Sequence, residues 1–315
     1  MTDYIARRLL VAVFTLFVIT FIVFLFIRLT PGDPIQTMLS SGKISPDLAD
    51  DMRAYYKLDK PIYVQYGNYL WKLAHGDLGF SFTTRRPVVD SIAQVFPNTL
   101  QLTVAAVLVA FSIAIPLGIL SSVHRNTPID HLCRIVSMIG ISMPNFWLGL
   151  LLLMWFGLRL NLLPMWGMGS LSDGLWDYVS HLILPAVTLG TALAGLLTRL
   201  TRSSFLDKIS QDYVKTARAK GLKERVVLYK HVLRNAIIPV VSMGGLQFGA
   251  LLGGSMIVET IFAWPGMGRL AINAIQKRDF PVLQGTTLVF AASLMVTLLL
   301  VDIINSFIDP AIRYD

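Results

Sequence analysis

Few side chains of this 315-residue chain are arranged for covalent chemistry. Cys133 is the only cysteine, so the chain alone can form neither a disulfide nor a cysteine-based metal site. The sequence has no phosphate-binding glycine loop ending in Gly-Lys-Ser/Thr, no HExxH and no GxSxG. The histidines are scattered and form no ligand cluster: His75, His124, His131, His181 and His231. The residues favour binding and translocation over catalysis, with no metal site and no cofactor in this chain.

The densest group of charged side chains lies in residues 199–235, which we call the inner segment. It holds ten basic and three acidic residues, so it carries most of the net charge of +8. A basic loop of this kind suits anionic lipid, and it also suits a protein partner. The residue types alone leave both interpretations open.

Helical spacing over residues 207–220 predicts a helix with Tyr213 and Ala217 on one face. Gly221 is a typical residue to end such a helix, and a second short helix is expected from about Glu224. Two short helices joined by glycine form a compact knob, and small residues at its centre admit the close approach of a partner.

Polar and small residues also interrupt the apolar run after the inner segment. Gly245, Gly249 and Gly253 recur every four residues and permit close helix packing, either within the chain or at a pore or partner. Gln247 either lines a path or forms an interhelical hydrogen bond. Glu259 is expected at the outer rim, about 35 Å past residue 236 at about 1.5 Å per residue, where it could gate a path or contact a partner.

A membrane must supply the framework that positions these residues. The chain is 54% hydrophobic and only 15% charged, whereas soluble domains carry about 25% charged residues. The same aliphatic excess argues against nucleic-acid binding. Six apolar segments are expected to span the membrane, which predicts an all-α integral membrane protein. These segments are residues 9–27, 99–123, 135–158, 182–197, 236–262 and 283–307.

The distribution of lysine and arginine predicts the orientation of these spans. With the N-terminus inside, the inner loops and termini hold fifteen basic residues and the short outer loops hold four. An excess of basic residues marks the cytoplasmic side. We therefore expect both termini to be cytoplasmic.

Residues 29–98, which we call the outer segment, are too long for a simple connection. Their many aromatic residues indicate that they fold on the outer face. Ser45 and Pro46 are typical of a helix start and predict a helix through about Lys57. A second helix is expected over residues 65–74.

Several motifs in order resemble the permease subunits of binding-protein-dependent ABC importers, in the dipeptide/oligopeptide/nickel branch. The inner segment resembles the "EAA" loop of that family, with Lys215-Thr216-Ala217 where the general motif has Glu-Ala-Ala. A contact made by a carboxylate at that position is therefore not expected here. The other matching motifs are Pro31-Gly32-Asp33-Pro34, His75-Gly76-Asp77-Leu78-Gly79, Ser142-Met143-Pro144, residues 262–269, Arg278-Asp279-Phe280-Pro281, Asp302 and residues 309–313.

The resemblance implies an ABC importer type I permease fold in a bacterial inner membrane. It implies a second, C-type permease, two ATP-binding subunits that hold ATP and magnesium, and a periplasmic or lipid-anchored substrate-binding protein. Coupling to the ATPases is then expected through Asp212, Tyr213, Lys215, Thr216, Ala217, Arg218, Ala219, Lys220, Gly221 and Leu222. Candidates for the path or gate are Gly245, Gln247, Gly249, Gly253 and Glu259, and candidates for contact with the binding protein are Asp77, Trp264 and Arg269.

The expected organisation has four parts. Residues 1–28 form the N-terminal tail and first span, and residues 29–98 form a scoop-like outer segment. Residues 99–307 form the permease core, which includes the inner segment, and residues 308–315 form a cytoplasmic tail.

The similarity favours dipeptides or short peptides as substrates, and the same architecture imports nickel chelates or glutathione. A stand-alone secondary transporter or channel is the competing class. It would place ionisable residues at mid-bilayer and show inverted half-repeats. The mid-span positions here are almost all apolar, and we find no internal repeat.

Overall fold

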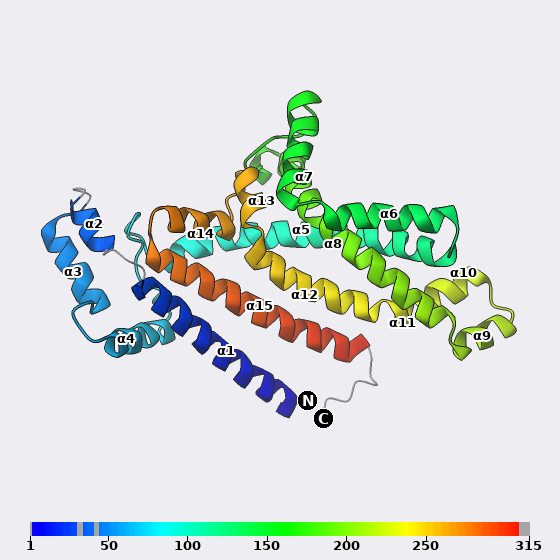
Figure 1. The fold of residues 1–315 in the computed structure, drawn as a ribbon, viewed down its shortest axis with the longest axis horizontal. Coiled ribbons are helices and arrows are strands. Elements are labelled where there is room, and N and C mark those ends of the chain that lie inside the picture. The colour runs from blue at the N-terminus through cyan, green and yellow to red at the C-terminus, as the bar shows by residue number, and fades with distance from the viewer. Residues whose placement is uncertain (1, 30–33, 41–43, 309–315) are drawn as a thin grey trace. The chain divides into compact units, whose positions relative to one another are not determined.

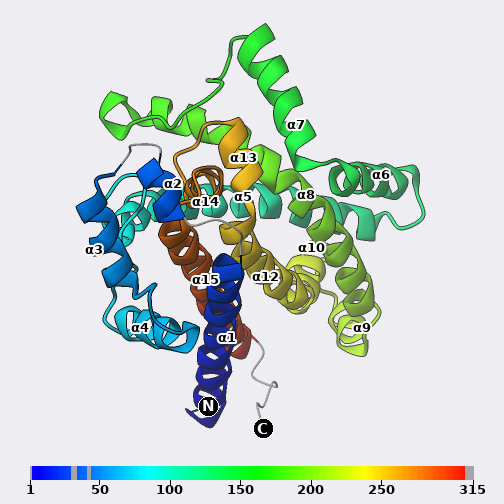
Figure 2. The same ribbon diagram turned by 60° about the vertical axis from the view of Figure 1, so that its left-hand side comes forward.

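The computed structural model describes residues 2–29, 34–40 and 44–308. The motif residues Pro31, Gly32 and Asp33 and the tail motif in residues 309–313 lie outside the described residues. The outer segment carries three short helices, and the inner segment is divided among several more (Figures 1 and 2). The elements are α1 (Thr2–Leu29), α2 (Pro34–Ser40), α3 (Pro46–Tyr56), α4 (Ile62–Ala74), α5 (Val88–Val123), α6 (Pro128–Ser142), α7 (Asn145–Leu152), η1 (Leu153–Arg159), η2 (Leu171–Asp173), α8 (Leu175–Ile209), α9 (Asp212–Ala219), α10 (Glu224–Val226), η3 (Val227–Val232), α11 (Leu233–Ala236), α12 (Ile238–Gly254), α13 (Met256–Ile261), α14 (Met267–Gln276) and α15 (Phe280–Ile308).

Within the described residues, four single helices are long and apolar enough to cross a membrane: α1, α5, α8 and α15. Counting each of two bent pairs as one span gives up to six, the number that the sequence predicts. The first pair joins α6 to α7 and η1 with a bend of 101°, and the second joins α10–α11 to α12 with a bend of 47°.

The third expected span, over residues 135–158, differs most from the structure. It begins earlier, at Pro128, and breaks between Ser142 and Asn145. A proline disfavours the helical conformation of the residue before it, and Met143 before Pro144 accordingly adopts an extended backbone with ψ of 122°. The Ser-Met-Pro motif therefore marks a sharp turn in the chain.

The fourth expected span, over residues 182–197, is longer in the structure. Helix α8 continues through Pro185 for 35 residues, from Leu175 to Ile209. The fifth, over residues 236–262, is divided in two, because α12 ends at Gly254 and α13 starts at Met256.

The chain forms two compact units. One comprises residues 1–97 and 269–292, and the other comprises residues 98–268 and 293–315. In the second unit α8 packs against α6, α7, α11, α12 and α13. Two glycines of α8 allow this packing, because an added Cβ would lie 2.7 Å from the carbonyl oxygen of Ala106 at Gly190, and 2.5 Å from that of Ser137 at Gly195.

The first helix predicted in the outer segment is confirmed in detail. The Ser45 hydroxyl accepts a hydrogen bond from the Leu48 amide at 3.3 Å, and Pro46 is the first residue of α3. Lys57 ends the helix in the left-handed conformation with φ of 51°. Helix α4 begins at Ile62, three residues before its expected start.

The helix expected over residues 207–220 is broken at its start. Helix α8 ends at Ile209, and Gln211 takes an extended backbone with ψ of 153° before α9 begins at Asp212. An acidic residue in the first turn favours a new helix N-terminus there. Gly221 has a φ of +73°, as expected of a residue that ends a helix.

Candidate functional site

Helix α9 is held to the second unit by its apolar side. Val214 and Ala217 are buried in a cluster with Phe205 of α8 and with Val227 and Val232 of η3. On the face predicted to carry Tyr213 and Ala217, Ala217 is buried and Tyr213 is exposed, and Val214 beside them is fully buried. The anchor fixes the orientation of α9.

The other side of α9 faces solvent. Of the ten predicted coupling residues, Ala217 is buried and the other nine are exposed: Asp212, Tyr213, Lys215, Thr216, Arg218, Ala219, Lys220, Gly221 and Leu222. An added Cβ at Gly221 would meet nothing within 4 Å. This surface is rich in small and basic residues, and the structure places it at the end of the unit that also holds α10 (Figure 1).

Exposed ion pairs connect the parts of this knob. Arg218 donates to both carboxylate oxygens of Glu224, at 3.1 and 2.6 Å, and so ties α9 to α10 across Gly221. Lys215 pairs with Asp212 at 2.8 Å within α9. Exposed pairs contribute little to stability, so the knob owes its shape mainly to the apolar anchor.

A buried ion pair that was not predicted from the sequence braces the structure beside this knob. Asp130 of α6 is fully buried and accepts two hydrogen bonds at 2.8 Å from Arg202 of α8. The Ser121 hydroxyl and the Asn126 amide also donate to it, at 2.6 and 3.0 Å. The run Thr-Pro-Ile-Asp at the start of α6 has the pattern of a helix N-terminus and could have singled out Asp130.

Glu259 is the centre of a second buried polar network. Its Oε1 accepts hydrogen bonds from Thr99 at 2.9 Å and from Ser255 at 2.7 Å, and its side chain is fully buried. Thr99 in turn accepts from the Met267 amide at 2.7 Å. At Gly266 an added Cβ would lie 2.5 Å from the Glu259 carboxylate carbon, so a larger residue there would displace this buried carboxylate.

Trp264 is part of the same network and has no exposed surface. Its indole nitrogen donates to the carbonyl of Asn98 at 2.9 Å, and the Asn98 amide donates to the carbonyl of Pro265 at 2.8 Å. The side chains of Glu259 and Trp264 are both buried within the second unit, whereas a gate or a partner contact calls for an accessible side chain. Both side chains join the start of the second span to the loop after α13.

The glycine stripe of α12 faces another helix of the same chain. An added Cβ at Gly245 would lie 2.1 Å from Val301 of α15, and at Gly249 it would lie 2.7 Å from Leu294. Intrachain packing therefore explains these two glycines. Gln247 and Gly253 are half-buried.

Asp77 and Arg269 belong to the first unit, whereas Trp264 belongs to the second. Asp77 accepts from the Tyr55 hydroxyl at 2.5 Å and from the Gly79 amide at 2.8 Å. Burial, together with the hydrogen bond to Asp77, raises the pKa of the Tyr55 phenol well above its ordinary value. Arg269 is half-exposed on α14.

A third buried carboxylate fixes the hairpin that follows the Asp77 motif. Asp279 accepts from the Ser81 hydroxyl at 2.5 Å and from the amides of Phe82 and Thr83 at 3.0 and 3.1 Å. These three hydrogen bonds hold residues 81–83 against the start of α15.

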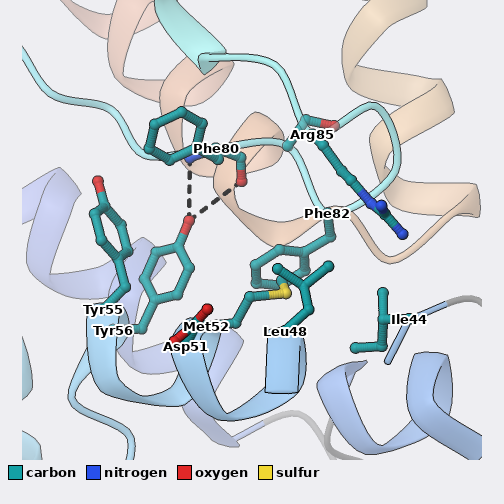
Figure 3. Close-up of a pocket in the computed structure, with 10 residues that line it drawn as sticks. Ile44, Leu48, Asp51, Met52, Tyr55, Tyr56, Phe80, Phe82 and Arg85 are labelled. Atoms are coloured by element: carbon teal, nitrogen blue, oxygen red, sulfur yellow. Dashed lines mark hydrogen bonds between the residues drawn. The ribbon is translucent and has the colours of Figure 1, made fainter. Parts of the chain in front are cut away.

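The hairpin closes one wall of an apolar pocket of about 300 Å³ in the outer segment (Figure 3). The Tyr56 hydroxyl donates to the carbonyl of Phe80 and accepts from its amide, both at 3.2 Å. Burial is the main reason that the pKa of Tyr56 is raised to about 12. The pocket is lined by Ile44, Leu48, Asp51, Met52, Tyr55, Tyr56, Phe80, Ser81, Phe82 and Arg85.

The Asp77 motif depends on glycine where it meets this pocket. Gly79 has a φ of +83°, and an added Cβ would lie 2.7 Å from the Tyr56 hydroxyl. Among the described residues, no group of three or more His, Cys, Asp or Glu side chains could hold a metal ion.

Comparison with known proteins identifies one family of transport components over nearly the whole chain. Residues 1–103 match the family model of the N-terminal part of binding-protein-dependent transport system membrane components, and residues 114–314 match the model of the inner membrane component itself. The glutathione transport system permease protein GsiC of Escherichia coli strain K12 is 43% identical over 314 residues, covering 100% of both chains. GsiC of Shigella flexneri serotype 5b is similar to the same extent.

Solved structures of two ABC transporters have a similar fold. An inward-facing structure of the MetNI methionine ABC transporter aligns with a TM-score of 0.58 at 17% identity, covering 70% of this chain and 96% of that chain. A crystal structure of an amino acid ABC transporter with histidines aligns with a TM-score of 0.50 at 15% identity, covering 78% and 98%. The chain thus has the type I permease fold and belongs to the family of binding-protein-dependent transport system inner membrane components, the permease subunits of ABC importers.

Proposed function

We propose that this chain is the B-type permease of an importer for short peptides, with glutathione and dipeptides as the substrates to test first. The observation that carries the proposal is the 43% identity to the glutathione permease GsiC over the full length of both chains. Glutathione is itself a small peptide, so it fits the short-peptide class that the sequence motifs favour. A nickel chelate is the alternative substrate class.

The complete importer would contain a C-type permease, two ATP-binding subunits and a substrate-binding protein. Both termini and the inner segment would then lie in the cytoplasm, in agreement with the excess of basic residues on that side. ATP and magnesium would bind to the ATPase subunits.

Helix α9 would dock in a groove of an ATPase subunit. Two features support this role: the buried anchor of Val214 and Ala217 fixes the direction of the helix, and its outward surface carries small and basic residues. Ala219 is exposed and small, so a partner could approach the helix closely there. Rigid attachment to α8 would let a push on α9 move a membrane span.

Gln247 and Gly253 remain the proposed positions along the transport path, because α15 covers the other two glycines of the stripe. Glu259 and Trp264 would instead hold the outer end of the second unit together. Asp77 and Arg269 remain the proposed contacts for the binding protein.

The test is uptake by the complete importer in proteoliposomes with its binding protein. We expect ATP-dependent uptake of labelled glutathione or dipeptides, with no uptake of a nickel chelate. Ala219→Glu should abolish transport while the permease still folds, and Ala54→Glu on exposed α3 is the control and should leave transport unchanged. Uptake of the nickel chelate alone would overturn the substrate class, and normal transport by Ala219→Glu would overturn the docking role.

A further inference from the structure

Two neighbouring helices of the outer segment present opposite surfaces. The exposed residues of α3 are mostly acidic or small: Pro46, Asp47, Asp50, Asp51 and Ala54. The exposed residues of α4, all of which the structure describes, include no charged side chain: Ile62, Tyr63, Gly67, Trp71 and Ala74. Tyr63 and Trp71 are 74% and 69% exposed. A helix that faces water normally presents its polar residues outward. Helix α4 instead presents uncharged, largely apolar residues outward.

The polar side chains of α4 point toward its own domain. Gln65 donates to the carbonyl of Lys60 at 2.8 Å. Asn68 and Lys72 donate to the carbonyl of Tyr55, at 3.4 and 2.9 Å. These three side chains donate to backbone carbonyls of the first unit, which leaves the outward surface of α4 aromatic and aliphatic.

The remaining side of α4 packs against the first span. The Tyr66 hydroxyl lies 3.1 Å from the Thr20 hydroxyl and donates to the carbonyl of Phe17 at 3.3 Å. The ring of Tyr69 stacks on Phe24 with centroids 5.9 Å apart. Figures 1 and 2 both show α4 beside the C-terminal half of α1.

The position of these contacts along α1 gives the depth of α4. The apolar stretch of α1 ends at Leu29, and Phe24 and Phe17 lie about 8 and 18 Å before that end at the helical rise. The hydrocarbon core of a bilayer is about 30 Å thick. The Phe24 contact therefore falls within the half of the membrane that the C-terminal end of α1 reaches, and the Phe17 contact falls near the bilayer centre.

We propose that α4 is a membrane-embedded helix that lies in this leaflet, with Tyr63 and Trp71 in contact with lipid. Its aromatic surface continues the exposed apolar surface of α1, where Phe14 and Phe21 are exposed. Tyrosine and tryptophan are the residues that favour the membrane interface. The outer segment is therefore partly a lipid-binding element, whereas α3, with its carboxylates, faces water.

Spin labels in the complete importer in nanodiscs test this placement. Single cysteines are introduced in a Cys133→Ala background by Tyr63→Cys, by Trp71→Cys and, as the water-facing control, by Ala54→Cys. Collision rates with oxygen, which partitions into lipid, are compared with those of a nickel chelate, which stays in water. We expect oxygen to dominate at 63 and 71 and the nickel chelate to dominate at 54.

A second measurement avoids the labelled variants. Tryptophan fluorescence is recorded in nanodiscs that contain brominated lipid, for the wild type and for Trp71→Phe. The quenched fraction should be smaller in Trp71→Phe, because one lipid-facing fluorophore is removed. Labels at 63 and 71 that behave like 54 would overturn the proposal, as would labels shielded from both reagents, since a protein partner would then cover this surface. Neither result depends on which substrate is imported, so the proposed function is tested separately.

Discussion

The inner and outer segments both lie between membrane spans, and they are built in opposite ways. In the inner segment α9 turns Val214 and Ala217 inward and presents charges. In the outer segment α4 turns its polar residues inward and presents aromatic ones. The difference shows that the surroundings of each helix decide its surface, because a helix can be amphipathic toward a protein core or toward lipid. Each prediction below tests one side of this contrast.

The largest effect is expected at the anchor of the inner segment. Val214→Asp buries an unpaired carboxylate and should destabilise the protein by about 4 kcal/mol or more, so that α9 detaches and transport is lost. Val226→Asp is the matched control, because Val226 is the last residue of α10 and is exposed. Uptake and limited proteolysis of the inner segment measure both effects. If both variants lost uptake equally, the added charge itself, and not its burial at position 214, would be the cause of the loss.

The buried ion pair beside the inner segment should have the next largest effect. Arg202→Met leaves Asp130 without its cation, and such a loss costs about 3 kcal/mol. Arg199→Met removes an exposed arginine of the same helix and should change little. Thermal unfolding of the solubilised protein measures the difference. Adding Asp130→Ala to Arg202→Met should recover part of the lost stability, and no recovery would contradict this reasoning.

The hairpin of the outer segment is anchored by the carboxylate of Asp279, which lies just before α15. Asp279→Asn replaces one carboxylate oxygen by an NH2 group, which faces the amide of Phe82 or that of Thr83 as a second donor and should cost about 2 kcal/mol. The hairpin should then open, and trypsin should cleave faster after Arg85, since Pro87 blocks cleavage after Arg86. Asp51→Asn on exposed α3 serves as the control. Unchanged cleavage in Asp279→Asn would mean that the hairpin is held by other contacts.

The smallest effect is expected where α4 meets α1. Tyr66→Phe keeps the ring but removes the hydrogen bonds to Thr20 and Phe17, at a cost of about 1 kcal/mol. Tyr63→Phe removes a hydroxyl from the exposed surface and should leave the unfolding temperature unchanged. The unfolding temperatures of Tyr66→Phe and Tyr63→Phe are compared in nanodiscs of the same lipid. A larger loss in Tyr63→Phe would place the functional contact on the outward surface of α4.

Local signals made part of this structure predictable. Ser45 and Pro46 define the start of α3, and Gly221 follows the end of α9, because capping and left-handed conformations depend on neighbouring residues alone. The length and composition of the apolar runs give the six spans, and the inner motif gives the family. Of the ten predicted coupling residues, nine are exposed, and their contact with an ATPase stays a prediction.

Features that depend on distant partners were not predictable. Asp130 and Arg202 are 72 residues apart, and nothing in either neighbourhood indicates their pairing. The burial of Trp264 depends on Asn98, which is 166 residues away. The bend of 101° follows from Pro144, but its size depends on packing against α8. Local chemistry thus predicts where a helix starts or stops, while packing decides which side chains are covered.

The close fit between Gly266 and Glu259 has a consequence for the history of this family. A side chain at position 266 would occupy the space of the Glu259 carboxylate, so neither position can change freely while the other stays the same. An alanine at 266 becomes tolerable when the acid at 259 is shortened to aspartate, and the shorter acid alone leaves a gap. The two positions are therefore expected to vary together among related permeases, and chimeras that mix them should fail even though each parent functions.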